Sequence, residues 1–473
     1  MLIAFVLYYP SLFGFFTHDD FFHLKISQIA SIEEFLNFFS LLNAPEGWGF
    51  YRPITTQVFY FLGRTLFNFV PFWMHTFSFV VFFLIIILVY KLALILTKKE
   101  TVAILAAFLY ATSATHFGHL YFLGTFQELG LAFFFLMSVL LFIQFLKNNT
   151  LLHYLFSIIF FLLALASKET AVMLPLVLLL VFGFIKLNSG IAISKYRLAI
   201  VASSFLVVQL LYLYLRFFLY GLVQGESYIW DFSPRFINTL FWYGLWSFNL
   251  PEMLVDFIGP GLRFNPNLFK FWSKEIIPIF VLFGAVITSI SYLAVKVRKK
   301  LKKKDFQIII FSLLWFVLTL IPVLFLPLHK FTFYLTLPLI GIVLPVSYLI
   351  EKAKATNSFR LVFASVWIIL SFATLQLTVE THWISQGSKV ARNAYVYFTQ
   401  YEKVEEGKKY IEFYDTGEDK ELPWSPSELV KVVLSQNNFF EVFFKDEFEL
   451  LQEENEWLGQ DVIRVRARSL LNY

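Results

Sequence analysis

The sequence predicts an all-α polytopic membrane protein with about eleven transmembrane helices, followed by a small extracytoplasmic α/β domain. Of its 473 residues, 58% are hydrophobic and 15% are charged, whereas soluble domains carry about 25% charged residues. Its mean hydropathy is +0.69. The chain contains 0 Cys, which excludes disulfides, thiol catalysis and cysteine-ligated zinc. Long apolar runs predict the transmembrane helices, and an abrupt change of charge near residue 384 predicts the separate C-terminal domain.

Apolar runs of roughly twenty residues predict the spans, because a helix of that length crosses a bilayer. We expect the spans at about 2–16, 70–96, 102–122, 129–146, 151–166, 171–187, 198–220, 276–296, 306–327, 332–350 and 361–381. The stretch 233–256 is aromatic and moderately apolar. It predicts a helix at the membrane interface, because a further span there would invert every later loop.

The distribution of Lys and Arg predicts the orientation. With the N-terminus in the cytoplasm, the inner loops hold 17 basic and three acidic residues, including the basic cluster 296–304. The outer side holds 10 basic and 13 acidic residues. We therefore expect a multi-pass protein of a prokaryotic plasma membrane, with a membrane domain at 1–384 and long outer loops at 17–69 and 221–275.

The formal net charge of +5 hides two different regions. Residues 1–384 carry 27 Lys/Arg and 16 Asp/Glu, whereas residues 385–473 carry 11 and 17. The tail is therefore an acidic external domain, and no nucleic-acid partner is expected. Ser425-Pro426-Ser427-Glu428 is typical of a helix start. Strands are predicted at Tyr410–Tyr414, Phe439–Phe444 and the alternating segment 463–468.

Charged groups beside a bilayer are functional candidates. Asp19 and Asp20 follow the first span, and a carboxylate pair there can hold one base ready to accept a proton. The alternative is a solvated helix end or a helix N-cap. Tyr51-Arg52-Pro53 places an arginine, which suits bidentate phosphate contact, near the second span. The alternative is an interfacial tyrosine beside a snorkelling arginine.

Further polar groups occupy short outer turns. Lys168 and Glu169 form either a local ion pair or part of an active site, and Glu128 lies in a similar turn. His116 and His119 have a spacing that permits metal ligation, but polar packing is the expectation because no third ligand is evident. The last candidates lie at the start of the tenth span and in the loop before residue 236. They are His329, Lys330, Tyr334 and Arg235, and the alternative is that they only anchor the chain at the membrane interface.

The order of these elements resembles the GT-C glycosyltransferases over roughly residues 1–385. Within them it is most similar to the polytopic O-mannosyltransferase-like proteins that use polyprenyl- or dolichyl-phosphate mannose. The elements in order are Asp19-Asp20, Tyr51-Arg52-Pro53, Glu128, Ser167-Lys168-Glu169, Ser233-Pro234-Arg235 and Lys330–Tyr334–Pro338–Gly341. Relatives usually carry Arg where Lys330 stands, and Gly-Arg before the glutamate where this chain has Thr125-Phe126-Gln127.

The resemblance implies a sugar donor carried on a polyprenyl phosphate, with mannose as one candidate sugar, and chemistry on the outer face. It implies that Asp19 is the general base, that Asp20 supports it, and that a single displacement inverts the anomeric centre. The implied phosphate-binding residues are Arg52, Lys168, Lys330 and Arg235, and the supporting residues are Tyr51, Glu128, Glu169, His329 and Tyr334.

The implied partners are the lipid-linked sugar, membrane lipids, and a protein, glycan or lipid acceptor. No resident cofactor is expected, and the sequence leaves a divalent metal open. Two other interpretations stand beside the enzyme: a secondary transporter, whose site would lie near the midplane, and a non-catalytic membrane scaffold that displays the acidic tail. The sequence contains no P-loop, Rossmann glycine pattern, H-E-x-x-H or G-x-S-x-G, so coupling to ATP is unsupported.

Overall fold

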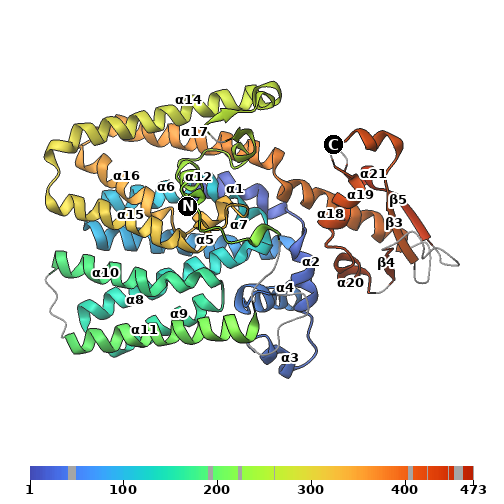
Figure 1. Cartoon of the computed structure of the whole chain (residues 1–473), viewed down its shortest axis with the longest axis horizontal. Helices are drawn as coiled ribbons and strands as arrows, with labels where there is room; N and C mark the ends of the chain where they lie inside the picture. The colour runs from blue at the N-terminus through green and yellow to red at the C-terminus, as the bar shows by residue number, and fades with distance from the viewer. Residues whose placement is uncertain are drawn as a thin grey trace.

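A bundle of long helices forms most of the molecule, and a small α/β domain sits at one end of it (Figure 1). The computed structural model describes residues 1–473 except 41–48, 190–194, 222–225, 260, 403–408, 423, 446, 452–461 and 472–473. The long helices are apolar around most of their circumference, which is typical of helices buried in protein or in lipid. They are α5 (Pro71–Thr97), α6 (Glu100–Ala111), α8 (Phe126–Asn148), α9 (Leu151–Leu165), α10 (Leu174–Ser189), α11 (Lys195–Leu215), α14 (Pro266–Val297), α15 (Lys303–Leu324), α16 (Ile340–Lys352) and α17 (Asn357–Thr381).

Within the described residues, seven helices are long and apolar enough to cross a membrane. They are Pro71–Thr97, Leu123–Asn148, Glu169–Asn188, Val201–Tyr220, Pro266–Lys300, Lys303–Leu324 and Asn357–Thr381. An eighth is added if the pair Glu100–Ala111 and Ala114–Tyr121, bent by 49°, counts as one span. The multi-pass helical class predicted from the sequence therefore agrees with the structure.

The predicted count of eleven spans is not confirmed. The runs at 2–16, 151–166 and 332–350 correspond to shorter helices, namely Leu2–Phe13, Leu151–Leu165 and Ile340–Lys352. Two of these runs contain a proline that lacks the amide hydrogen a helix interior needs: Pro10 lies in the 3-10 turn that ends the first, and Pro338 precedes the third.

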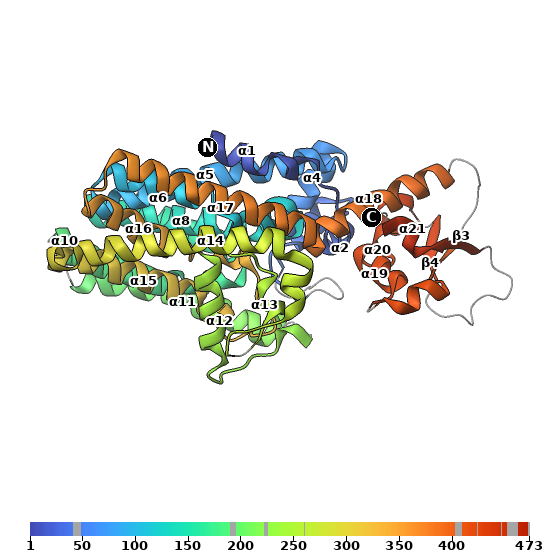
Figure 2. The same ribbon diagram turned by 90° about the horizontal axis from the view of Figure 1, so that it is seen from above.

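Short elements cover the end of the bundle that faces the α/β domain. Helix α12 (Arg235–Trp246) has 12 residues, too few to cross a bilayer, as the interfacial interpretation of 233–256 predicts. Figure 2 shows α12 and α13 (Leu254–Phe257) projecting from one side of the bundle. The other short elements are α1 (Leu2–Tyr8), α2 (Asp19–Ile26), α3 (Ile32–Asn37), the π-helical turn η2 (Ile54–Val58), α4 (Phe59–Phe67), α7 (Phe117–Tyr121), β1 (Ile258–Gly259) and β2 (Arg263–Phe264).

The C-terminal domain has a three-stranded parallel sheet in the order β4-β3-β5. Its elements are α18 (Trp383–Glu402), β3 (Lys409–Tyr414), α19 (Pro426–Val433), α20 (Asn438–Phe444), β4 (Phe448–Leu450), β5 (Val462–Arg466) and α21 (Ala467–Leu471). The predicted helix start is confirmed, since the Ser425 hydroxyl accepts a hydrogen bond from the Glu428 amide at 3.2 Å. The strand predicted at 410–414 is confirmed as β3. The segment predicted at 463–468 is confirmed as strand β5 up to Arg466, but residues 467 and 468 are wrong, because they begin helix α21.

The strand predicted at Phe439–Phe444 is wrong, because this segment forms helix α20. A short run that is apolar except for Glu441 carries no clear period that separates helix from strand. Here the helix lets Phe440 and Phe444 pack on Phe398, with ring centroids at 5.0 and 6.2 Å, while Phe439 reaches Phe21 of the bundle at 5.2 Å. Tertiary packing therefore decides the conformation.

The two ends of the bundle carry different sets of ion pairs. Lys99 and Arg360 both bind Glu351, at 3.8 and 2.9 Å, and Lys352 binds Asp305 at 2.7 Å. These residues belong to loops and helix ends predicted on the inner side. We call this region the basic end; it includes the α14–α15 connection, at the left of Figure 1, away from the α/β domain.

Candidate functional site

A cavity of about 130 Å³ lies at the end of the bundle next to the C-terminal domain. It gathers one carboxylate, two cations and many aromatic rings from segments far apart in the sequence. Its described lining is Asp19, His23, Phe50, Arg52, Phe122, Gly124, Thr125, Gln127, Lys168, Tyr228, His329, Phe331, Phe333, Tyr334 and Trp383. Five of the predicted site residues therefore share one cavity: Asp19, Arg52, Lys168, His329 and Tyr334.

Asp19 is the first residue of α2, and its side chain opens into the cavity. Protein surrounds the cavity closely, so desolvation raises the pKa of the Asp19 carboxyl, while the positive charge of Arg52 opposes this shift. A carboxylate with a raised pKa is a stronger proton acceptor than an exposed aspartate. Asp19 is therefore a carboxyl that lines the cavity and whose pKa is raised by burial.

Asp20 has a different surrounding. Its side chain is buried and accepts hydrogen bonds from the Tyr60 hydroxyl at 2.5 Å and from the Thr17 amide at 2.9 Å. Burial raises its pKa to about 7. Asp20 lies outside the described lining, so its contacts assign it to holding the turn that presents Asp19. Within this turn, His18 has a left-handed φ of 51°.

Arg52 is held by a glutamate, a glutamine and an aromatic ring. Its Nε and Nη2 lie 2.9 and 2.8 Å from Glu169 Oε2, and its Nη1 donates to Gln127 Oε1. The guanidinium lies 3.9 Å from the centroid of Phe50, a cation–π contact. Arg216 reaches the other Glu169 oxygen at 3.9 Å. Glu169 thus orients two arginines at this end of the bundle.

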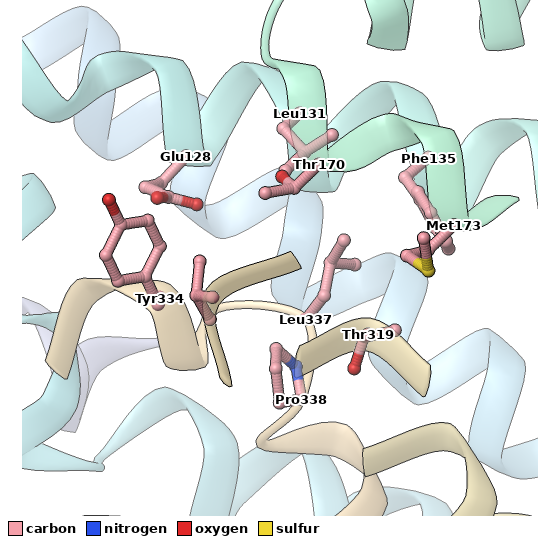
Figure 3. Close-up of a pocket in the computed structure, with 10 residues that line it drawn as sticks. Glu128, Leu131, Phe135, Thr170, Met173, Thr319, Tyr334, Leu337 and Pro338 are labelled. Atoms are coloured by element: carbon pink, nitrogen blue, oxygen red, sulfur yellow. The ribbon is translucent and has the colours of Figure 1, made fainter. Parts of the chain in front are cut away.

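Lys168 and Glu128 form a fully enclosed ion pair. Each side chain is 3% exposed, and the Lys168 ammonium also lies 4.5 Å from the ring centroid of Tyr334. Glu128 faces a second, very small cavity of about 10 Å³, shown in Figure 3, which has room for about one water. Tyr334 lines both cavities, so its ring forms part of the wall between them.

The two histidines of the cavity wall are neutral near pH 7. Burial is the main cause in each case and lowers the pKa of His23 to about 3 and that of His329 to about 4. They can donate or accept hydrogen bonds but carry no charge there. Across the described lining, the positive charge therefore comes from Arg52 and Lys168.

Six predicted residues lie outside the described lining: Asp20, Glu128 and Glu169, whose contacts are given above, and Arg235, Lys330 and Tyr51. Arg235 is 77% exposed and pairs with Asp231 at 3.4 Å. The Lys330 ammonium interacts with the Asp256 carboxylate rather than with the cavity groups. Tyr51 donates from its hydroxyl to the Phe39 carbonyl at 3.1 Å. The structure does not bring Arg235 and Lys330 to the phosphate-binding position that the resemblance implied.

Sequence reasoning missed Trp383, Tyr228 and Glu252. Trp383 and Tyr228 line the cavity. Glu252 accepts hydrogen bonds from the Thr332 amide at 2.6 Å and hydroxyl at 2.7 Å, and its other oxygen lies 3.2 Å from His382. Glu252 thereby fixes both the segment that carries His329 and Tyr334 and the start of α18. Its sequence signal, a glutamate after Pro251 in an aromatic stretch, is weak.

The histidine pair deeper in the bundle packs as the polar-packing interpretation predicts. His116 Nδ1 lies 2.9 Å from His119 Nε2, and His116 Nε2 lies 2.7 Å from the Tyr110 carbonyl. Within the residues that the structure describes, no group of three or more His, Asp or Glu side chains is arranged to hold a metal.

An apolar groove of about 320 Å³ begins beside the cavity. It runs between η2, α4, α5 and α8, and its described lining is Ile54, Thr55, Val58, Phe59, Leu62, Gly63, Leu66, Phe67, Met74, Phe77, Val80, Val81, Leu84, Phe126, Gly130, Phe133 and Phe134. Phe126 lies between Thr125 and Gln127, which line the cavity, and Ile54 follows Arg52 by two residues. The groove and the cavity are therefore lined by neighbouring residues of the same two segments, although their described linings share no residue.

No protein-family model matches the chain, and no curated protein matches it either. The fold and the site together define a multi-pass helical protein with a cavity that joins a carboxylate to two buried cations, next to an apolar groove.

Proposed function

We propose that the protein is a membrane glycosyltransferase of the GT-C type. It transfers a sugar, with mannose as the first candidate, from a polyprenyl-phosphate donor to an acceptor hydroxyl on the extracytoplasmic face. The observation that carries the proposal is the single cavity shared by Asp19, Arg52 and Lys168. Acid–base chemistry and phosphate binding both have to meet at one sugar, so a shared cavity is what the reaction requires.

The reaction balances with the groups at hand. The Asp19 carboxylate accepts the proton of the acceptor hydroxyl as its oxygen forms a bond to the anomeric carbon. The bond between that carbon and the phosphate oxygen breaks, and the polyprenyl phosphate leaves with the electron pair. Arg52 and Lys168 stabilise the charge that develops on the leaving phosphate. A single displacement of this kind inverts the anomeric centre.

The size and lining of the cavity support a monosaccharide as the group transferred. The cavity volume of about 130 Å³ is a few times the roughly 30 Å³ that one water occupies in the liquid, which suits one sugar unit rather than an oligosaccharide. The aromatic rings of Phe122 and Tyr228 offer apolar faces to the C–H side of a pyranose. Neutral His23 and His329 add hydrogen-bonding groups for its hydroxyls.

The apolar groove supports a lipid-linked donor over a nucleotide sugar. Its lining exposes 17 mainly aliphatic and aromatic residues beside Arg52, which suits an isoprenoid chain attached to a phosphate. The charges are also compatible. Arg52 and Lys168 both line the cavity, and a phosphodiester donor carries a negative charge that such cations bind.

The test is reconstitution of the purified protein in vesicles with synthetic polyprenyl-phosphate mannose and a mixture of acceptor glycans, peptides and lipids. We expect donor-dependent release of polyprenyl phosphate and a new mannosylated product of inverted configuration. Other polyprenyl-phosphate sugars tested in parallel identify the sugar if mannose is not transferred. A protein that binds no polyprenyl-phosphate sugar, measured by tryptophan quenching, contradicts the proposal.

A further inference from the structure

The first turn of α18 forms part of the candidate site, although α18 also begins the C-terminal domain. Trp383, its first residue, lines the cavity and is 37% exposed. Its ring meets His18 edge to face at 4.7 Å and Phe122 at 5.5 Å. Trp383 therefore packs directly against the residue that precedes Asp19.

Gly387 lies one turn further along α18 and brings the helix against the same segment. A Cβ atom at Gly387 would lie 2.5 Å from His18 Cε1 and 2.6 Å from Thr17 Oγ1. Real Cβ atoms do not approach other atoms so closely, so a larger residue has to displace the His18 ring and the Thr17 hydroxyl, which belong to the segment before Asp19. The glycine is thus required for this contact and not for its own backbone conformation.

Further contacts from α18 and from the rest of the C-terminal domain hold the same segment. The His18 amide donates to the Val433 carbonyl at 2.7 Å, and the Phe15 amide donates to Ser388 Oγ at 2.7 Å. At the far end of α2, Lys25 pairs with Glu441 at 2.7 Å. The contacts enclose His18, whose left-handed φ of 51° is unfavourable for a residue with a side chain.

We propose that the C-terminal domain is a positioning element of the site, which holds the turn 17–19 so that Asp19 faces the cavity. Gly387 and Trp383 are its positioning residues. That the domain affects catalysis rests on the proposed glycosyl transfer. That it holds the turn 17–19 in place does not depend on that function. The domain therefore acts on the reaction through Asp19 and is more than an external appendage of the membrane bundle.

The first test compares two helical glycines. Gly387→Ala places a methyl group against His18, whereas Gly284→Ala in α14 meets nothing within 4 Å. Alanine favours a helix over glycine, so neither change is expected to lower the thermal midpoint through α-helix propensity. We expect kcat of Gly387→Ala to fall about 100-fold with donor KM within about threefold, because a small misplacement of a reacting group costs about that much. Gly284→Ala should match the wild type.

The second test examines the ring contact. Trp383→Ala should lower kcat at least about tenfold, and Trp383→Phe should restore much of the loss because it keeps an aromatic edge against His18. Trp424→Ala is the matched control, since Trp424 is a similarly exposed tryptophan (39%) of the same domain that lies outside the described cavity lining. Equal rates for all three variants and the wild type would overturn the role of Trp383.

A third measurement needs no activity. Hydrogen–deuterium exchange of the backbone amides at 15–21 should rise at least about tenfold in Gly387→Ala and not in Gly284→Ala. If exchange rises but the wild-type protein transfers no sugar, the positioning role stands and the proposed function fails. If exchange and kcat are both unchanged in Gly387→Ala, the positioning role is refuted.

Discussion

The two ends of the helical bundle use ion pairs in opposite ways. At the basic end, Asp305 binds Lys352, the Lys302 amide at 2.6 Å and the Tyr348 hydroxyl at 2.5 Å, and so closes the start of α15. At the cavity end, Lys168–Glu128 is more deeply buried, with each side chain 3% exposed, whereas Arg52–Glu169 is buried to about the same degree as Lys352–Asp305. Both cations also line the cavity. The first arrangement completes a helix end, whereas the second keeps charge available to a ligand.

This difference matters because buried ion pairs contribute little net stability. Removing two charges from water costs several kcal/mol for each ion, and a well-packed apolar pair of the same size is often as stable or more stable. Lys168 and Glu128, each 3% exposed, are therefore poorly explained by stability alone. A binding role at the cavity accounts for them, and the following variants test the contrast between the two ends.

The largest effect is expected for Asp19→Asn. The amide keeps the shape of the side chain but cannot accept the proton of the acceptor hydroxyl, so transfer should fall by about 10²–10⁴-fold. Donor binding, measured by tryptophan quenching, should persist because Arg52 and Lys168 are intact. Full activity in this variant would eliminate Asp19 as the base.

The next effect is expected for Arg52→Gln. Loss of a charge-assisted contact to phosphate should raise donor KM about 10- to 100-fold, since such contacts contribute about 1.5–3 kcal/mol. Arg235→Gln is the matched control, because Arg235 is 77% exposed and pairs with Asp231 away from the cavity. It should leave KM within about twofold of the wild type. Equal effects of the two changes would place the phosphate elsewhere.

The pH dependence of transfer gives a smaller effect of known sign. Asp19 must be ionised to act as a base, and burial raises its pKa above the usual 3.8. The value of kcat/KM should therefore rise about tenfold for each pH unit below that raised pKa and then become constant. The bound phosphodiester adds negative charge, so the rise in kcat should occur at higher pH. A profile that falls over this range would contradict the assignment.

The smallest effect on activity is expected at the basic end. Lys352→Met removes one partner of Asp305, which keeps its bonds from Lys302 and Tyr348. We expect a loss of about 1 kcal/mol in the free energy of unfolding, and kcat for each folded molecule within about twofold of the wild type. Denaturant unfolding and the transfer assay measure the two quantities separately. A tenfold loss of kcat would mean that the basic end also influences the site.

Parts of the fold followed directly from the sequence. Apolar runs of bilayer length leave the backbone little choice but a helix, because that is how its polar groups are satisfied away from water. The Ser425 cap and the alternation at 463–466 are local signals, and both were confirmed. Seven or eight helices, rather than eleven, are long enough to cross a membrane. Hydropathy alone does not show where a helix ends, for example at a proline, so it overestimates the number of spans.

The sequence by itself also determined which residue types belong to the site, since Asp19, Arg52 and Lys168 are charges placed next to lipid-length runs. Tertiary structure alone decided their partners. Arg52 binds Glu169 across 117 positions, and Lys168 binds Glu128 across 40. A charge pairs with the nearest opposite charge in space, which no spacing along the chain reveals.

Tertiary structure likewise separated the candidates that are alike in sequence. Arg235 and Lys330 are cations of the same predicted face, yet both lie outside the cavity lining: Arg235 pairs with Asp231, and Lys330 interacts electrostatically with Asp256. Trp383, which follows the last span, reaches the cavity because α18 packs against His18. The physical reason is the same in each case: local sequence determines helix and charge, whereas the packing of helices determines which side chains meet.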